Sequence, residues 1–85
     1  MRLDFRYFAW VRERVGTGEE TLDVPSDVAD AAGLIDWLAS RGEGYGQAFG
    51  EPRALRVAFD MQQVSMDASL AGVREVAIYP PMTGG

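Results

Sequence analysis

The last seven residues of the chain carry the residue types and spacing best suited to chemistry. They read Tyr79-Pro80-Pro81-Met82-Thr83-Gly84-Gly85. Proline cannot continue a strand ladder and favours an extended polyproline conformation, so the two prolines should direct this segment off the body of the protein. The two glycines have no Cβ, so the final peptide units can enter a slot too narrow for any side chain. We expect a single domain over 1–79 followed by an extended tail over 80–85.

The residue inventory leaves this tail as the reactive part of the chain. There is no cysteine and no histidine, and all eight basic residues are arginines. This excludes thiolate metal sites, thiol nucleophiles, imidazole bases and lysine Schiff bases, and we expect no metal site. The remaining group is the α-carboxylate of Gly85, which becomes electrophilic only when its oxygen is made a leaving group. Adenylation by ATP would do this, and attack by a persulfide sulfur would then lead to a thiocarboxylate.

Charge and hydropathy narrow the classes of partner. The formal net charge is −5 and the pI is about 4.5, which argues against nucleic acid and permits a basic protein partner. No apolar run approaches the ~20 residues of a membrane span, and the first residues lack the apolar region of a signal peptide. We therefore expect a cytoplasmic protein with no membrane contact.

The elements that must position the tail begin with two strands. Residues 1–9 alternate between an apolar face (Met1, Leu3, Phe5, Tyr7, Ala9) and a face that starts charged and ends in Phe8 and Trp10. A glycine-rich turn over 16–18 and a second strand over 21–24 complete a predicted hairpin. A helix is predicted over 27–41, with Ser26 or Asp27 as the N-cap and Gly42 in the left-handed position after its end.

The second half of the chain predicts returning strands. Residues 42–53 hold four glycines and read as a connection with one short turn near 47–49. Strands are predicted over 55–60 and 74–79, with a short additional one within 61–66. The order predicts an α+β domain, a mixed sheet of four or five strands with one main helix packed on one face.

At this point the chain resembles a known family. The ending from Pro80 to Gly85 is similar to the Pro-Pro-Val-Thr-Gly-Gly ending of the molybdopterin synthase small subunit, a ubiquitin-like sulfur carrier with a β-grasp fold. Supporting similarities run along the whole chain, at Phe8-Ala9 with Val11-Arg12-Glu13, at Gly33-Leu34-Ile35, and at Val64-Ser65. The chain departs from the family at Asp60, where an asparagine is frequent, and at the turn over 71–76.

The resemblance implies a route and a set of partners. A ubiquitin-E1-like adenylyltransferase would form the Gly85 acyl-adenylate with ATP, and a sulfurtransferase would supply the sulfur. The loaded tail (Pro80, Pro81, Met82, Thr83, Gly84) would insert into the synthase large subunit, where the sulfur builds the dithiolene of molybdopterin. The chain would bind no cofactor of its own. Because it lacks acid, base and oxyanion groups suited to this chemistry, the catalytic groups are expected on the large subunit.

Docking also needs a surface. If the first, third and last strands are neighbours, Phe8 and Trp10 should lie near Ala58 and Tyr79 on the outward face of the sheet, with Arg12 beside them. We expect these five residues to form a partner-binding patch. The alternative is that Phe8 or Trp10 is covered by the segments 11–18 or 42–53.

Three other functions remain open from the sequence. A carrier for thiamine or cysteine biosynthesis shares the diglycine but usually lacks Pro-Pro-x-Thr before it. A ubiquitin-like modifier would join target lysines through the same carboxylate. A plain interaction module would leave the tail unmodified.

Overall fold

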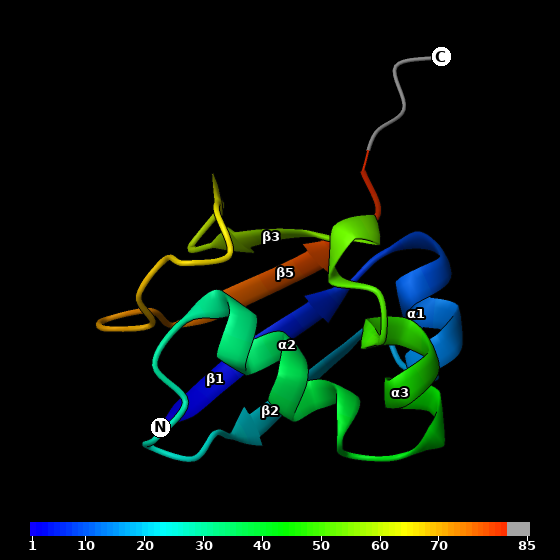
Figure 1. Cartoon of the computed structure of the whole chain (residues 1–85), viewed down its shortest axis with the longest axis horizontal. Helices are drawn as coiled ribbons and strands as arrows, with labels where there is room; N and C mark the ends of the chain where they lie inside the picture. The colour runs from blue at the N-terminus through cyan, green and yellow to red at the C-terminus, as the bar shows by residue number, and fades with distance from the viewer. Residues whose placement is uncertain (82–85) are drawn as a thin grey trace.

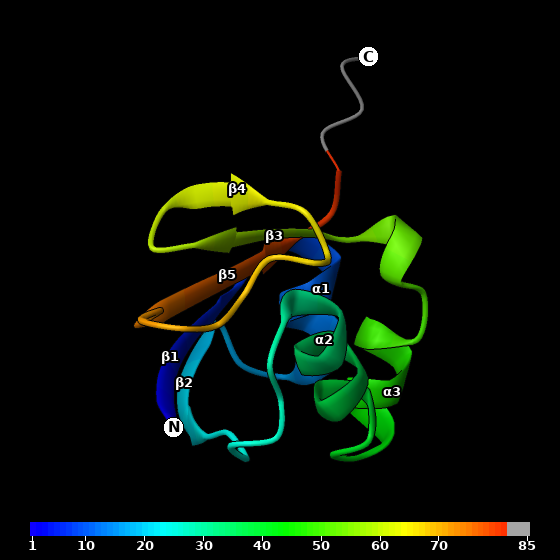
Figure 2. The ribbon, with the colours of Figure 1, turned by 60° about the vertical axis from the view of Figure 1, so that its left-hand side comes forward.

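The computed structural model describes residues 1–81 and consists of one sheet with all its helices on one side (Figures 1 and 2). The strands are β1 (Arg2–Tyr7), β2 (Glu19–Asp23), β3 (Arg56–Phe59), β4 (Gln62–Val64) and β5 (Glu75–Tyr79). The helices are α1 (Ala9–Val15), α2 (Ala31–Ala39) and α3 (Glu43–Phe49), with a 3₁₀ turn η1 at Pro52–Ala54. The predicted α+β class and mixed sheet are confirmed.

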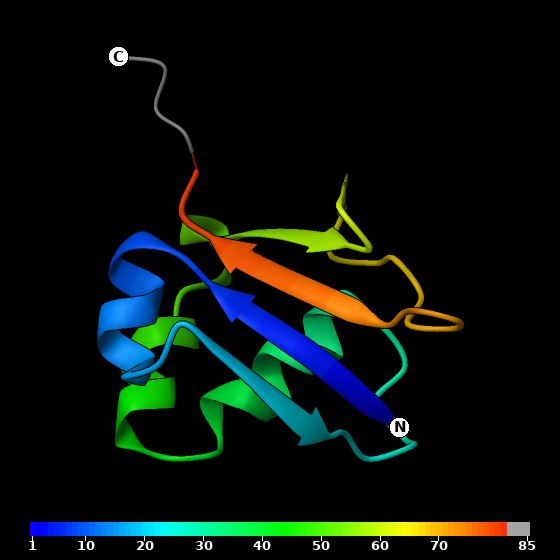
Figure 3. The same ribbon diagram turned by 180° about the vertical axis from the view of Figure 1, so that it is seen from behind.

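The sheet order is β2-β1-β5-β3-β4, so the last strand of the chain lies in the middle. β1 runs parallel to β5, and every other neighbouring pair is antiparallel. Seen from behind, the sheet face turned away from the helices is left uncovered by any of them (Figure 3). We call this surface the open face.

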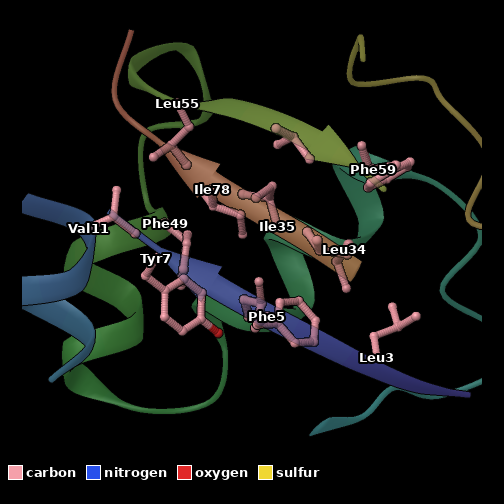
Figure 4. Close-up of a cluster of buried hydrophobic side chains, with 14 of the residues drawn as sticks. Leu3, Phe5, Tyr7, Val11, Leu34, Ile35, Phe49, Leu55, Phe59 and Ile78 are labelled. Carbon is pink, nitrogen blue, oxygen red and sulfur yellow. The ribbon is translucent and has the colours of Figure 1, made fainter. Parts of the chain in front are cut away.

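The core lies between the sheet and the helices. The alternation predicted for β1 places Leu3, Phe5 and Tyr7 in the core at 1% exposure or less. The same helix-facing side takes the apolar residues of β5 and the stripe of α2, as the close-up shows for Ile78, Leu34 and Ile35 (Figure 4). Burial of these side chains, at roughly 1.5–3 kcal/mol each, is what holds the helices to the sheet.

The first predicted hairpin is wrong in one respect, because a helix separates its strands. β1 ends at Tyr7, and residues Ala9–Val15 form α1, which buries Val11. The helix ends where Gly16 takes φ +98° and donates its N–H to the Arg12 carbonyl, at 2.9 Å. This left-handed position is the reason for a glycine here.

The main helix is shorter than predicted. α2 begins after Asp30, whose side chain accepts a hydrogen bond from the Gly33 N–H at 2.8 Å, and neither Ser26 nor Asp27 is the N-cap. It ends at Ser40 in a right-handed conformation, and Gly42 is extended and precedes the next helix.

The predicted connection over 42–53 contains α3 and η1. Gly44 lies so close to α1 that a Cβ there would come within 2.5 Å of the Arg14 carbonyl oxygen. Glycine at this position therefore allows the two helices to touch, and Phe49 from the end of α3 is buried against Tyr7, with ring centroids 5.8 Å apart.

Candidate functional site

The base of the tail is fixed by the central strand of the sheet. β5 is hydrogen-bonded on both sides, and its Val76 and Ile78 have no exposed surface. After Tyr79 the chain leaves the sheet, and Pro80 and Pro81 lead away from the body (Figures 1 and 3). The predictions for Met82, Thr83, Gly84 and Gly85 lie outside the described residues.

The start of β5 is held by Asp60, from the turn between β3 and β4. The carboxylate oxygen Oδ1 of Asp60 accepts hydrogen bonds from the backbone N–H groups of Arg74 at 3.1 Å and Glu75 at 2.9 Å. The Asp60 N–H donates to the Glu75 carbonyl at 2.9 Å. Asp60 takes φ +49°, a left-handed conformation that aspartate and asparagine tolerate better than other side chains. One residue therefore fixes both the turn and the entry into the tail-bearing strand.

Phe8 and Tyr79 both lie at the end of the sheet from which the tail leaves. The Phe8 N–H donates to the Ile78 carbonyl at 3.2 Å, which continues the parallel register of β1 and β5 by one residue. This register places Phe8 beside Tyr79 on the open face. The Phe8 side chain is 47% exposed, a large fraction for an aromatic ring, and Tyr79 is half-buried.

Ala58 is buried on the open face, and its part in partner contact stays a prediction. Tyr79 donates a hydrogen bond from its hydroxyl to Gln63 Oε1, at 3.1 Å. Because β3 lies between β5 and β4, the Tyr79 side chain reaches across β3 to make this bond, from its position opposite Arg56 toward Gln63, which lies opposite Ala58. Ala58 is only 7% exposed.

Trp10 and Arg12 lie on α1 and not on the sheet, so the predicted placement of Trp10 on the outward face of the sheet is wrong. This ring is partly buried against the core, and the Arg14 guanidinium lies 4.4 Å from its centroid. Arg12 is exposed and packs along Gly18, where a Cβ would come within 3.0 Å of its Nε. Arg12 nevertheless lines one hollow together with Phe8. Phe8 and Tyr79 lie at the tail exit, and Arg12 lines a hollow beside Phe8; we call these three residues the aromatic patch.

A carboxylate shared by two tyrosines ties α3 to the sheet beneath this region. Glu20 of β2 accepts hydrogen bonds from the hydroxyls of Tyr7 at 2.9 Å and Tyr45 at 2.8 Å. Burial raises the pKa of Tyr7 far above its usual value of 10.0, and the hydrogen bond to Glu20 raises it further. The same two causes raise the pKa of Tyr45. No local pattern in the sequence indicates this cluster, because its members come from three separate elements.

Two further features bear on the chemistry available to residues 1–81. Within this part of the chain, no three histidine, cysteine, aspartate or glutamate side chains are grouped as metal ligands would be. No helix there is long and apolar enough to cross a membrane.

Sequence comparison links the chain to one family along almost its whole length. The model of the ThiS family matches residues 5–85. The molybdopterin synthase sulfur carrier subunit of Escherichia coli (strain K12) is 35% identical over 79 residues, which cover 93% of this chain and 94% of that protein. The protein of the same name from Haemophilus influenzae is 29% identical over 83 residues, covering 98% and 99%.

Solved structures share the fold at lower identity. A putative molybdopterin converting factor, subunit 1, from Pyrococcus furiosus superposes with a TM-score of 0.67 at 18% identity, covering 96% of this chain and 99% of that one. The small archaeal modifier protein 1 of Haloferax volcanii gives 0.63 at 17% identity, covering 95% and 98%. The β-grasp fold implied by the resemblance is thereby confirmed.

Proposed function

Because this chain belongs to the ThiS family, we propose that it is the sulfur carrier subunit of a molybdopterin synthase, the role named for its relatives. The observation that carries the proposal is the diglycine ending, which follows two prolines at the end of a fully hydrogen-bonded central strand. Such a strand gives the tail a rigid base, and the prolines direct it away from the sheet.

The proposed chemistry takes place at the Gly85 carboxylate. An E1-like adenylyltransferase binds ATP, and the carboxylate attacks its α-phosphorus, which releases pyrophosphate and leaves an acyl-adenylate. A sulfurtransferase persulfide then attacks the acyl carbon and displaces AMP. A second thiol cleaves the resulting S–S bond and is itself oxidised to a disulfide, which frees the thiocarboxylate. ATP is used by the activating partner, and the carrier binds no cofactor itself.

The loaded tail then delivers sulfur inside the synthase large subunit. Thr83, Gly84 and Gly85 offer little side-chain bulk to a narrow channel, and the thiocarboxylate sulfur attacks the pterin precursor there. The carrier is a tethered cosubstrate, since docking of its body makes sulfur delivery effectively intramolecular. The acid, base and oxyanion groups come from the large subunit, and all these partners meet the carrier in the cytoplasm.

We propose that the aromatic patch is the surface by which residues 1–79 dock on the large subunit. Phe8 is an exposed aromatic ring directly beside the base of the tail, and aromatic residues are enriched in the buried cores of protein interfaces. A partner that encloses the tail must approach this end of the sheet, where it would cover Phe8.

Intact-mass spectrometry tests the proposal. The full chain is incubated with the activating enzyme, ATP and a persulfide donor, beside a variant lacking Gly84 and Gly85 and a matched Met82→Val variant. We expect the mass difference of sulfur for oxygen in the full chain and in Met82→Val, and no change in the truncated chain. An unmodified full chain, or a ladder of protein adducts on lysines, would overturn the proposal. The truncated chain should melt at the temperature of the full chain, because the core lies within the body.

A further inference from the structure

A groove lies beside the tail exit, toward the β4 edge of the sheet. It runs between η1 and β4, and its floor is formed by the buried side chains of Leu55 and Val57 with the half-buried Val64 and Met66. We call this the η1–β4 groove. Two exposed arginines, Arg53 and Arg56, are among the residues that line it.

Neither arginine is neutralised within the described chain. Among residues 1–81 the ion pairs join the Met1 amine to Asp23 and Arg6 to Glu75. Arg56 donates from Nη1 to the Leu55 carbonyl at 2.9 Å, which orients the guanidinium but leaves its charge uncompensated. Two uncompensated cations beside an apolar floor are the complement of an acidic segment with aliphatic side chains.

The groove borders the tail through the strand register. Arg56 lies opposite Tyr79 in the antiparallel pairing of β3 with β5, so the groove opens next to the last residue before Pro80. A protein that encloses the tail must lie against the groove as well as against Phe8.

We propose that the η1–β4 groove is a second docking site for the synthase large subunit, and that it takes an acidic, aliphatic segment of that subunit. This inference rests on the proposed function and adds the chemistry of the contact. Carboxylates of the segment pair with Arg53 and Arg56, and its aliphatic side chains cover Val64 and Met66. The aromatic patch supplies apolar contact on one side of the tail, and the groove supplies charge pairing on the other.

Calorimetric titration of the full chain with its large subunit tests the inference. The groove variant is Arg53→Glu/Arg56→Glu, and the matched control is Arg2→Glu/Arg74→Glu, which makes the same charge change on exposed arginines outside the groove. We expect at least a tenfold loss of affinity for the groove variant and less than a threefold change for the control. Met66→Gln should lose about threefold, because its side chain is half-buried and the change keeps the net charge. The affinity of the unmodified chain should fall as salt rises, and the groove variant should lose most of that dependence.

Equal changes for the groove and control variants, or a groove variant that binds like the unmodified chain, would overturn the inference. Melting curves of all variants show whether each one is folded. Failure of the proposed function is recognised separately. In that case the chain without substitutions would gain no thiocarboxylate when it is incubated with the activating enzyme and the sulfur donor. If the chain without substitutions is loaded with sulfur while the groove variant binds the large subunit normally, the groove proposal alone is refuted.

Discussion

Replacing Asp60 tests how the tail-bearing strand is held. In Asp60→Ala, the N–H groups of Arg74 and Glu75 lose their shared carboxylate acceptor. Asp60 is exposed, so water replaces part of each bond, and we take about 0.5–1 kcal/mol for each of the two bonds. Alanine at φ +49° adds about 0.5–1 kcal/mol, because it lacks the local hydrogen bonding that lets aspartate adopt this conformation. The free energy of unfolding should fall by about 2 kcal/mol.

The matched variant is Asp60→Asn. An amide oxygen can accept the same two hydrogen bonds, and asparagine tolerates the left-handed conformation, so the loss should stay within about 0.5 kcal/mol. Asp36→Ala, on the exposed side of α2, controls for the loss of one negative charge. Urea unfolding followed by tryptophan fluorescence measures all three, and the melting temperature of Asp60→Ala should fall by about 10 °C.

Two results would refute this reasoning. If Asp60→Asn loses as much stability as Asp60→Ala, the charge of Asp60 matters and its hydrogen-bond geometry does not. If Asp60→Ala is as stable as the unmodified chain, the start of β5 is held by the sheet pairing alone.

Three further predictions concern the patch, the turn and alkaline pH. Phe8→Arg should weaken binding to the large subunit about tenfold or more, as measured by calorimetry. The free energy of unfolding should fall by less than about 1 kcal/mol, because the Phe8 ring is 47% exposed. Unchanged affinity would remove Phe8 from the interface. Met61→Gly should raise the free energy of unfolding in urea by about 1 kcal/mol, because Met61 takes the left-handed φ of +72°, which glycine adopts without strain, and its side chain is 89% exposed. A lower free energy of unfolding for the variant would contradict this prediction. Because burial raises the pKa of Tyr7 above its unfolded value of 10.0, stability should hold below pH 10 and fall above it by at most about 1.4 kcal/mol per pH unit for this group. Tyr7→Phe should flatten that alkaline fall in pH-dependent urea unfolding, and an unchanged slope would show that Tyr7 is not its source.

The strands and the core of α2 could be predicted from the sequence because their patterns are set locally. Alternation in β1 and the stripe through Leu34, Ile35 and Leu38 are repeated contacts with one apolar layer, and such contacts leave a period in the sequence. The order of the strands in the sheet could not be predicted in the same way, because pairing between strands that are far apart in the sequence leaves no local period.

The short helices could not be predicted because tertiary contacts stabilise them. Residues 9–15 continue the apolar alternation of β1 through Val11, and a seven-residue helix has little intrinsic stability in water. Gly44 lowers the helix propensity of α3, but it permits the close approach to α1. The burial of Phe49 then stabilises a segment that reads locally as a loop.

Tertiary contacts also explain why the predicted patch was placed correctly only in part. Phe8 could be placed because it follows directly from the β1 register, whereas Trp10 turns away once the chain enters α1. Ala58 has the right strand and the right face, but the Tyr79–Gln63 hydrogen bond that reaches across its strand joins two other strands. Arg53 and Arg56 had no motif to mark them, since their groove exists only when η1 packs beside β4.

The reach of the tail links the two proposed docking surfaces. Six residues follow Tyr79, and at ~3.4 Å per residue they extend at most about 20 Å. A partner that binds the end of such a short tail must lie against whatever borders Tyr79, which is Phe8 through the parallel register and Arg56 through the antiparallel one. Apolar contacts act mainly on dissociation, and charges act mainly on association and its salt dependence. Phe8→Arg should therefore raise the dissociation rate from the large subunit, and the groove variant should lower the association rate at low salt. If both variants change the same rate constant to the same degree, the two surfaces do not make separate contacts.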